Sequence, residues 1–119
     1  MSMLWVNNVG QSISVFALPE EPRDSSEPWP RALAAADFLG DRWWISRVIV
    51  RARDNRGKGL GSEVLRRLLD EIAKQPCTTV CVSPGGYDGD TERQWAFYVK
   101  NGFKPGDEPD LLVWEPSTD

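Results

Sequence analysis

The feature that most constrains the fold is a run of three patterns between residues 45 and 74. Residues 45–50 are an apolar stretch that predicts a strand, residues 56–61 carry glycine at every second position, and residues 59–74 predict an amphipathic helix. Alternate glycines let successive backbone N–H groups face one concavity, and the helix start adds its positive dipole end. The turn therefore favours a bound anion such as a phosphate group. A tight strand-to-helix connection without a ligand is the alternative.

Cationic side chains gather around this turn, although the chain as a whole has a net charge of −4. Between residues 47 and 58 the single carboxylate Asp54 is outnumbered by Arg47, Arg51, Arg53, Arg56 and Lys58. Cations oppose the dipole at a helix start, so their presence favours an anionic ligand over a merely solvated strand end. The negative total charge makes nucleic acid an improbable partner.

Two absences restrict the chemistry. The chain has 0 histidines, which removes histidine base catalysis and the histidine triads. Its 2 cysteines, Cys77 and Cys81, have no second pair to complete a zinc site, so we expect reduced packing residues and no metal. Acid and base roles must fall to Tyr, Asp, Glu, Lys, Cys or water.

The length of 119 residues predicts one domain, with any active site built within one sheet. No apolar run approaches the roughly 20 residues that a bilayer span needs. Residues 1–5 lack the charged and apolar regions of a signal peptide. We therefore expect a soluble, cytoplasmic protein with no membrane partner.

The first third of the chain, residues 1–41, predicts a hairpin, a loop and a short helix. Residues 3–6 and 12–18 are short apolar stretches around a turn at residues 7–10, which predicts an antiparallel hairpin. Residues 19–30 hold four prolines and predict a loop. The alanine-rich residues 31–39, stopped by Gly40, predict a short helix. Residues 42–51, with two tryptophans and a β-branched run, predict a strand.

Beyond the glycine turn the elements alternate. The helix of residues 59–74 has apolar residues at helical spacing, and its charged pairs Glu63/Arg67 and Arg66/Asp70 are four residues apart. Pro76 ends it, and residues 78–83 predict a buried strand. A strand, helix and strand in this order predict two parallel strands. Residues 84–90 then predict a loop.

A second informative segment is residues 91–103. Thr91 is a suitable cap for a helix that runs to about Asn101, and Gly102 is its stop. From Phe103 onward a strand pair is predicted, interrupted near residues 105–109. Alone, this segment is an ordinary amphipathic helix that packs on a sheet.

Taken together, the two segments are much more specific. Over about residues 43–114 the chain resembles the GCN5-related N-acetyltransferases (the GNAT superfamily), whose acetyl-coenzyme A site is built from two motifs in this order. Here the motifs are Arg56-x-x-Gly59-x-Gly61 and Phe97-Tyr98-x-Lys100-x-Gly102-Phe103. A P-loop enzyme is excluded, because no lysine and serine follow the second glycine as that motif requires.

The resemblance implies a single domain of the α/β (α+β) class, a mixed sheet flanked by helices and splayed between its two central parallel strands. Residues 42–115 would form the acetyl-coenzyme A (acetyl-CoA) binding core, with pantetheine in the gap. The cofactor-binding residues it implies are Ile49, Val50, Arg51, Arg56, Gly57, Lys58, Gly59, Leu60, Gly61, Ser62, Thr91 and Lys100.

Tyr98 matches the general acid of the family. A phenol of pKa about 10 can protonate a departing thiolate whose conjugate acid has a pKa of about 8 to 9. Packing of the helix onto the sheet is the alternative role. The implied activity is transfer of an acetyl group from acetyl-CoA, the acyl-donor substrate, to a primary amine by direct attack.

The chain departs from the family pattern in three places. Thr91 stands where asparagine is common, and no carboxylate occurs within residues 45–50, where many members place a glutamate that deprotonates the amine. No general base is therefore identified, although Asp41, Asp54, Asp88 or Asp90 could act through water. The family also usually has paired helices in the acceptor region, which is abbreviated here.

The acceptor stays open at this stage. Acidic residues in two predicted loops suggest a cationic acceptor, and a short acceptor region suits a protein lysine, an N-terminus or a small amine. Trp5, Trp29, Trp43 and Trp44 are candidates for lining its site. The alternative function is a non-catalytic binding or inhibitor protein of the same fold that acts on a protein partner.

Overall fold

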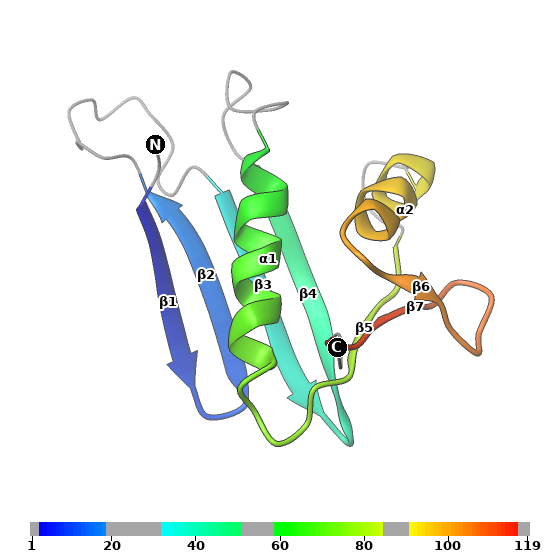
Figure 1. The fold of residues 1–119 in the computed structure, drawn as a ribbon, viewed down its shortest axis with the longest axis horizontal. Coiled ribbons are helices and arrows are strands. Elements are labelled where there is room, and N and C mark those ends of the chain that lie inside the picture. The colour runs from blue at the N-terminus through cyan, green and yellow to red at the C-terminus, as the bar shows by residue number, and fades with distance from the viewer. Residues whose placement is uncertain (1–2, 19–31, 51–58, 85–90, 117–119) are drawn as a thin grey trace.

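The fold is one seven-stranded mixed sheet with two helices (Figure 1). The structure, a computed structural model, describes residues 3–18, 32–50, 59–84 and 91–116. The strands lie in the order β1-β2-β3-β4-β5-β7-β6. In chain order the elements are β1 Met3–Val9, β2 Ser12–Leu18, β3 Ala32–Leu39, β4 Arg42–Val50, α1 Leu60–Ile72, β5 Val80–Val82, α2 Thr91–Lys100, β6 Lys104–Pro105 and β7 Leu112–Trp114.

Strands β1 to β4 form an antiparallel half-sheet. The predicted first hairpin is confirmed, although β1 continues to Val9 and the turn lies at residues 10–11. Gly10 and Gly40 turn the chain with φ of 61° and 72°, a conformation that glycine adopts without steric cost. Residues 19–30, predicted as a loop, lie outside the described residues.

The helix predicted for residues 31–39 is wrong, because Ala32–Leu39 is the strand β3. Ala32, Ala34 and Ala36 are fully buried on one face, at the two-residue spacing of a strand. Alanine's preference for helix amounts to tenths of a kcal/mol, whereas pairing with strands on both sides satisfies the whole backbone. Small side chains also let α1 pack closely on this strand.

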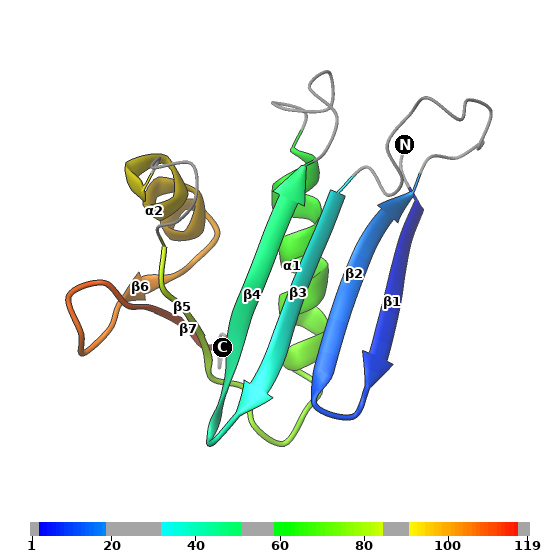
Figure 2. The same ribbon diagram turned by 180° about the vertical axis from the view of Figure 1, so that it is seen from behind.

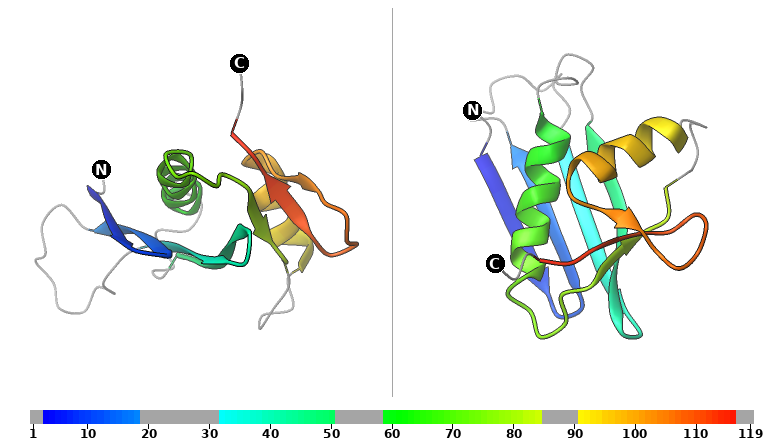
Figure 3. Two further views of the ribbon diagram at one scale, coloured as in Figure 1. Left: turned by 90° about the horizontal axis from the view of Figure 1, so that it is seen from below. Right: turned by 45° about the vertical axis from the view of Figure 1, so that its right-hand side comes forward.

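Helix α1 covers one face of the antiparallel half-sheet, as Figures 1 and 3 show, and Figure 2 shows the reverse face with the strands in front of the helix. Its apolar side is buried, as the helical spacing predicted: Leu60, Val64, Leu65, Leu68, Leu69 and Ile72. These residues pack on Ile13 and Val15 of β2 and on the β3 alanines in one hydrophobic core. The strongest helix in the sequence therefore fixes the position of Gly59 and Gly61 on the sheet.

The sheet splays between β4 and β5. These strands are parallel, as predicted, but they pair only at Trp43↔Val80 and Trp44↔Cys81 near the start of β4. Beyond Trp44 the strands diverge, and β5 leads away towards α2 (Figure 1). The carboxyl half of β4 therefore has no strand partner on that side among the described residues.

Helix α2 follows β5 and ends as predicted at Gly102, which has φ of 99°. The backbone N–H groups of Asn101 and Phe103 both donate to Tyr98 O and close the last turn. Phe103 is buried, and its ring contacts Tyr98 edge to face with centroids 5.3 Å apart. Strands β6 and β7 then return to the sheet beside β5. No described helix has the length and apolar character to cross a membrane.

Candidate functional site

The start of α1 offers backbone donors. Gly59 stands at the N-cap position with φ of 79°, and its carbonyl accepts the N–H of Glu63 at 2.9 Å. Among the described residues, no side chain makes a capping hydrogen bond at this helix end. The N–H groups of Leu60, Gly61 and Ser62 are therefore available to an anion, because the first turn of a helix has no internal acceptors.

Three elements meet beside this turn. A Cβ added to Gly61 would lie 3.4 Å from Val50 Cγ2 and 3.4 Å from Phe97 Cε1. The end of β4, the first turn of α1 and the middle of α2 are therefore in van der Waals contact. Segments about 50 residues apart in the sequence therefore meet where β4 and β5 diverge. This is the arrangement expected if the two motifs build one site.

The structure describes some of the residues that were predicted to bind pantetheine and the pyrophosphate. Ile49 and Val50 are half-buried near the end of β4, beyond its pairing with β5. Their backbone is thus free to bind an extended amide chain along this edge. Arg51, Arg56, Gly57 and Lys58 lie outside the described residues, so their predicted contacts stay predictions.

Asn101 joins the two helices of the site. Its Nδ2 donates to Ser62 Oγ at 3.2 Å and to the Phe97 carbonyl at 2.8 Å. Its Oδ1 accepts Nε of Arg66 at 3.2 Å. With 9% of its surface exposed, Asn101 is the buried polar residue of the described core. The bonds to Ser62 and Arg66 hold the end of α2 against α1, and the bond to Phe97 fixes the amide on α2 itself.

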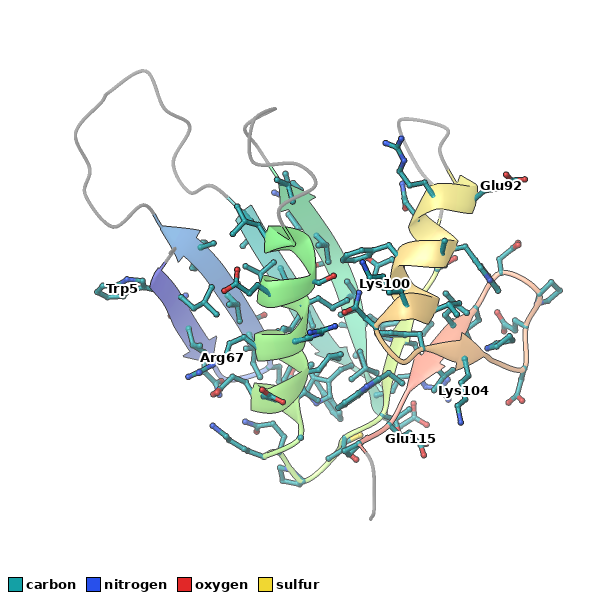
Figure 4. The ribbon with its side chains drawn as sticks, turned by 45° about the horizontal axis from the view of Figure 1, so that its top comes forward. Trp5, Arg67, Glu92, Lys100, Lys104 and Glu115 are labelled. Atoms are coloured by element: carbon teal, nitrogen blue, oxygen red, sulfur yellow. The ribbon has the colours of Figure 1, made fainter. Side chains whose placement is uncertain are left out.

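A shallow hollow of about 430 Å³ runs along the outer surface of α1. Its lining residues are Leu4, Gly59, Ser62, Glu63, Arg66, Arg67, Asp70 and Lys100. The end beside α2 contains the predicted residues Gly59, Ser62 and Lys100. The end with Leu4 lies towards β1, away from the splay. Figure 4 shows Lys100 on the side of α2 near α1 and Arg67 on the far side of α1.

The remaining predicted binding residue, Thr91, begins α2. A rise of 1.5 Å per residue separates it from Lys100 by roughly 14 Å along the helix. The two positions therefore lie at opposite ends of α2.

Tyr98 is buried, with 6% of its surface exposed. Its ring packs edge to face between Phe97 and Phe103, with centroids 5.2 and 5.3 Å away. Burial raises the pKa of Tyr98 to about 12, because a phenolate is poorly solvated there. The hydroxyl is consequently protonated at neutral pH, as a proton donor must be.

The structure identifies no general base among its described residues. Asp41 lies in the turn before β4, at the end of that strand remote from α1's first turn, and pairs with Arg42 at 3.1 Å. The hydrogen bond and charge of Arg42 lower the pKa of Asp41. Asp54, Asp88 and Asp90 lie outside the described residues. Within the described ranges no cluster of carboxylates and cysteines is suited to a metal.

The sequence did not predict the partners of three polar residues near this site, Arg66, Arg67 and Asn101. Arg66 was expected to pair with Asp70, but it binds Asn101 instead. Arg67 was expected to pair with Glu63, and its ion pair is with Glu71, at 3.4 Å. Asn101 appeared only as the last residue before a glycine stop. Their partners are distant in sequence, so local spacing could not identify these hydrogen bonds.

The four tryptophans predicted to line an acceptor site differ in their surroundings. Trp43 is buried in the core, and its Nε1 donates to the Cys77 carbonyl at 3.0 Å, so it does not line an acceptor site. Trp5 is 56% exposed and points outward from β1 (Figure 4). Trp44 is half-buried, and Trp29 lies outside the described residues. Both cysteines are free thiols, as expected.

Searches with the sequence alone find no matching protein-family model and no matching curated protein. The structure, in contrast, is similar to many solved ones. A GNAT family acetyltransferase from Elizabethkingia anophelis with acetyl-CoA bound superposes with a TM-score of 0.70 at 12% identity, over 97% of this chain and 98% of that one.

Two further structures show the range of the similarity. The PaiA N-acetyltransferase of Thermoplasma acidophilum, in complex with coenzyme A, has a TM-score of 0.67 at 14% identity, over 89% of this chain and 62% of that one. The anti-CRISPR protein AcrVA5 has a TM-score of 0.61 at 18% identity, over 71% of this chain and 90% of that one. At these identities the similarity shows the fold, which is that of the GCN5-related N-acetyltransferases.

Proposed function

We propose that this protein is an acyltransferase that moves the acetyl group of acetyl-CoA to a primary amine. The observation that carries the proposal is the splay between β4 and β5, which opens beside the uncapped start of α1. The unpaired edge of β4 offers backbone partners for the amides of pantetheine. The first turn of α1 offers N–H donors for the pyrophosphate. Solved structures of the same fold contain coenzyme A or acetyl-CoA.

In the proposed reaction the amine nitrogen attacks the thioester carbonyl and forms the C–N bond. Backbone N–H groups of the β4 edge stabilise the oxyanion. The C–S bond then breaks, and Tyr98 donates a hydrogen bond and its proton to the departing sulfur. The proton lost by the amine goes to water, and Tyr98 regains its proton from solvent.

Burial of Tyr98 has two opposite consequences for this step. A pKa of about 12 keeps the hydroxyl protonated before reaction, but it also makes the phenol a weaker acid than the thiol that it protonates. The main contribution of Tyr98 is therefore a hydrogen bond to the developing thiolate. Full transfer of the proton to the thiolate is uphill by this pKa difference, so it is completed only as solvent returns a proton to Tyr98.

The proposed acceptor is a primary amine on a protein, a lysine or an N-terminus, or a small amine. Strands β1 and β2 are joined directly at residues 10–11, whereas the family usually has paired helices in the part of the chain before the first motif. An acceptor region with no helix among its described residues suits an amine presented on a larger molecule.

A second candidate function is a non-catalytic protein of this fold that binds a protein partner. It is favoured by the absence of a carboxylate on β4 and by the abbreviated N-terminal part. One structural neighbour is described as an anti-CRISPR protein, which shows that the fold occurs outside proteins described only as acetyltransferases.

Calorimetric titration with acetyl-CoA, followed by mass spectrometry on a panel of peptides and polyamines, separates these functions. The proposal predicts binding, a gain of one acetyl group on an amine, and an equal amount of free thiol. Binding without transfer would favour the second function. If the protein does not bind acetyl-CoA at all, the proposed acyltransferase function is wrong.

A further inference from the structure

We infer that Arg66, held in place by Asn101, is a binding residue for the pyrophosphate of the acyl donor. The inference rests on the proposed function. It adds to the backbone N–H groups at the start of α1 a side chain from the second turn of that helix and a positioning residue from the end of α2. It assigns a role to the buried amide at the junction of the two helices.

The orientation of the Asn101 amide follows from the chemistry of its partners. The Phe97 carbonyl can only accept, so it must face the NH₂ group, and Arg66 Nε can only donate, so it must face the oxygen. A flipped amide would place its oxygen against the Phe97 carbonyl oxygen and its NH₂ group against the N–H of Arg66 Nε. The side chain therefore has one satisfied orientation.

This orientation determines where the Ser62 hydroxyl points its proton. Ser62 Oγ accepts from Asn101 Nδ2, so its O–H is directed to another acceptor. Ser62 has no such acceptor among the described residues and lines the hollow beside Gly59. The serine proton is thus free for an anion at the start of α1.

The same amide also orients the Arg66 guanidinium. Its Nε is used by Asn101 Oδ1, which leaves the N–H groups of the two terminal nitrogens. Those groups have no acceptor within the described part of the chain. Arg66 is exposed and lines the same hollow as Ser62 and Lys100. A planar fork with one edge fixed matches the geometry of phosphate oxygens.

Arg67 provides a matched control. It is also an arginine of α1 and also lines the hollow, but it pairs with Glu71 and lies on the side of α1 away from α2 (Figure 4). If general positive charge on α1 bound the donor, the two arginines would contribute equally. If the Asn101 contact matters, only Arg66 contributes.

The test is calorimetric titration of the full chain with coenzyme A. We expect Arg66→Gln to weaken binding on the order of ten-fold, the scale of one charge-assisted hydrogen bond, and Arg67→Gln to leave it within about two-fold. Thermal denaturation of each variant confirms that it is folded. Equal binding by wild type and Arg66→Gln would overturn the inference and leave the proposed function intact. No binding by the wild type would overturn both.

Two further titrations identify which phosphate group Arg66 binds and test the positioning role of Asn101. Dephospho-coenzyme A lacks the 3′-phosphate, so the Arg66→Gln loss should be the same with this ligand. A loss that disappears would assign Arg66 to the 3′-phosphate and overturn the pyrophosphate assignment. In the Asn101→Ala background, Arg66→Gln should cost at most about three-fold, because its orientation is already lost. Additive losses would contradict the positioning role.

Discussion

At the scale of single residues, Tyr98 is the side chain on which the proposed chemistry depends. Its place near the end of α2 was predicted from the second motif. Its burial could not be predicted, because tertiary packing determines the positions of the Phe97 and Phe103 rings that enclose it. A buried hydroxyl with no hydrogen-bond partner among the described residues does little for stability.

We therefore expect Tyr98→Phe to lower the turnover number by about 100-fold, the scale of a lost general acid, with little change in acetyl-CoA affinity. The free energy of unfolding should change by less than about 1 kcal/mol, since the ring is retained and no hydrogen bond is lost. Steady-state kinetics, calorimetry and urea denaturation measure the three quantities. Unchanged turnover would remove Tyr98 from the mechanism.

The raised pKa of Tyr98 predicts a stability change in alkali. The pKa is about 12 in the folded protein and about 10 in the unfolded chain, so the unfolded state loses its proton first as the pH rises. The stabilisation is complete below pH 10 and declines between pH 10 and 12 by roughly 2–3 kcal/mol. Urea denaturation at pH 9 and 11.5 should show a smaller decline in Tyr98→Phe. An equal decline in both proteins would contradict the burial.

The two glycines at the start of α1 should respond differently to alanine. Gly59 has φ of 79° in open space, so Gly59→Ala should cost about 1 kcal/mol of stability through backbone strain alone. Gly61 has no such φ, and an added Cβ would meet Val50 and Phe97 at ordinary contact distances. Gly61→Ala should be neutral or stabilise by up to about 1 kcal/mol. Chemical denaturation of both variants tests this ranking, and a larger loss for Gly61→Ala would contradict it.

At the scale of elements, the sequence predicted those whose patterns extend over a long segment or end in clear signals. The apolar spacing of α1, the hairpin of β1 and β2, and the parallel pair β4 and β5 are confirmed. The error at β3 has a physical origin. A run of alanines is compatible with either structure in isolation, and the choice depends on strands that lie elsewhere in the sequence.

The packing of α1 on β3 leads to a prediction for that strand. Ala34 has no exposed surface beneath α1, so Ala34→Leu should force the helix away from the sheet and cost about 1–3 kcal/mol. Ala35 lies next to it on the reverse face and is half-buried. Ala35→Leu, the matched control, should cost less. Thermal denaturation compares them, and an equal loss would contradict the close approach of α1.

At the scale of the whole molecule, the site is a junction between the two halves of the sheet. The antiparallel half carries α1, the smaller half carries α2, and they are joined at the narrow pairing of β4 with β5. The motifs predicted which segments meet there. They could not predict the Asn101 hydrogen bonds that join the two helices, because an amide buried by tertiary contacts has no local pattern.

The central claim is that the splay holds the acyl donor, and a crystal structure of the protein with coenzyme A tests it most directly. The account predicts pantetheine between β4 and β5, extended along the edge of Ile49 and Val50, with the pyrophosphate against residues 59–62. Coenzyme A bound elsewhere on the molecule, or β4 and β5 paired along their whole length in the complex, would contradict it.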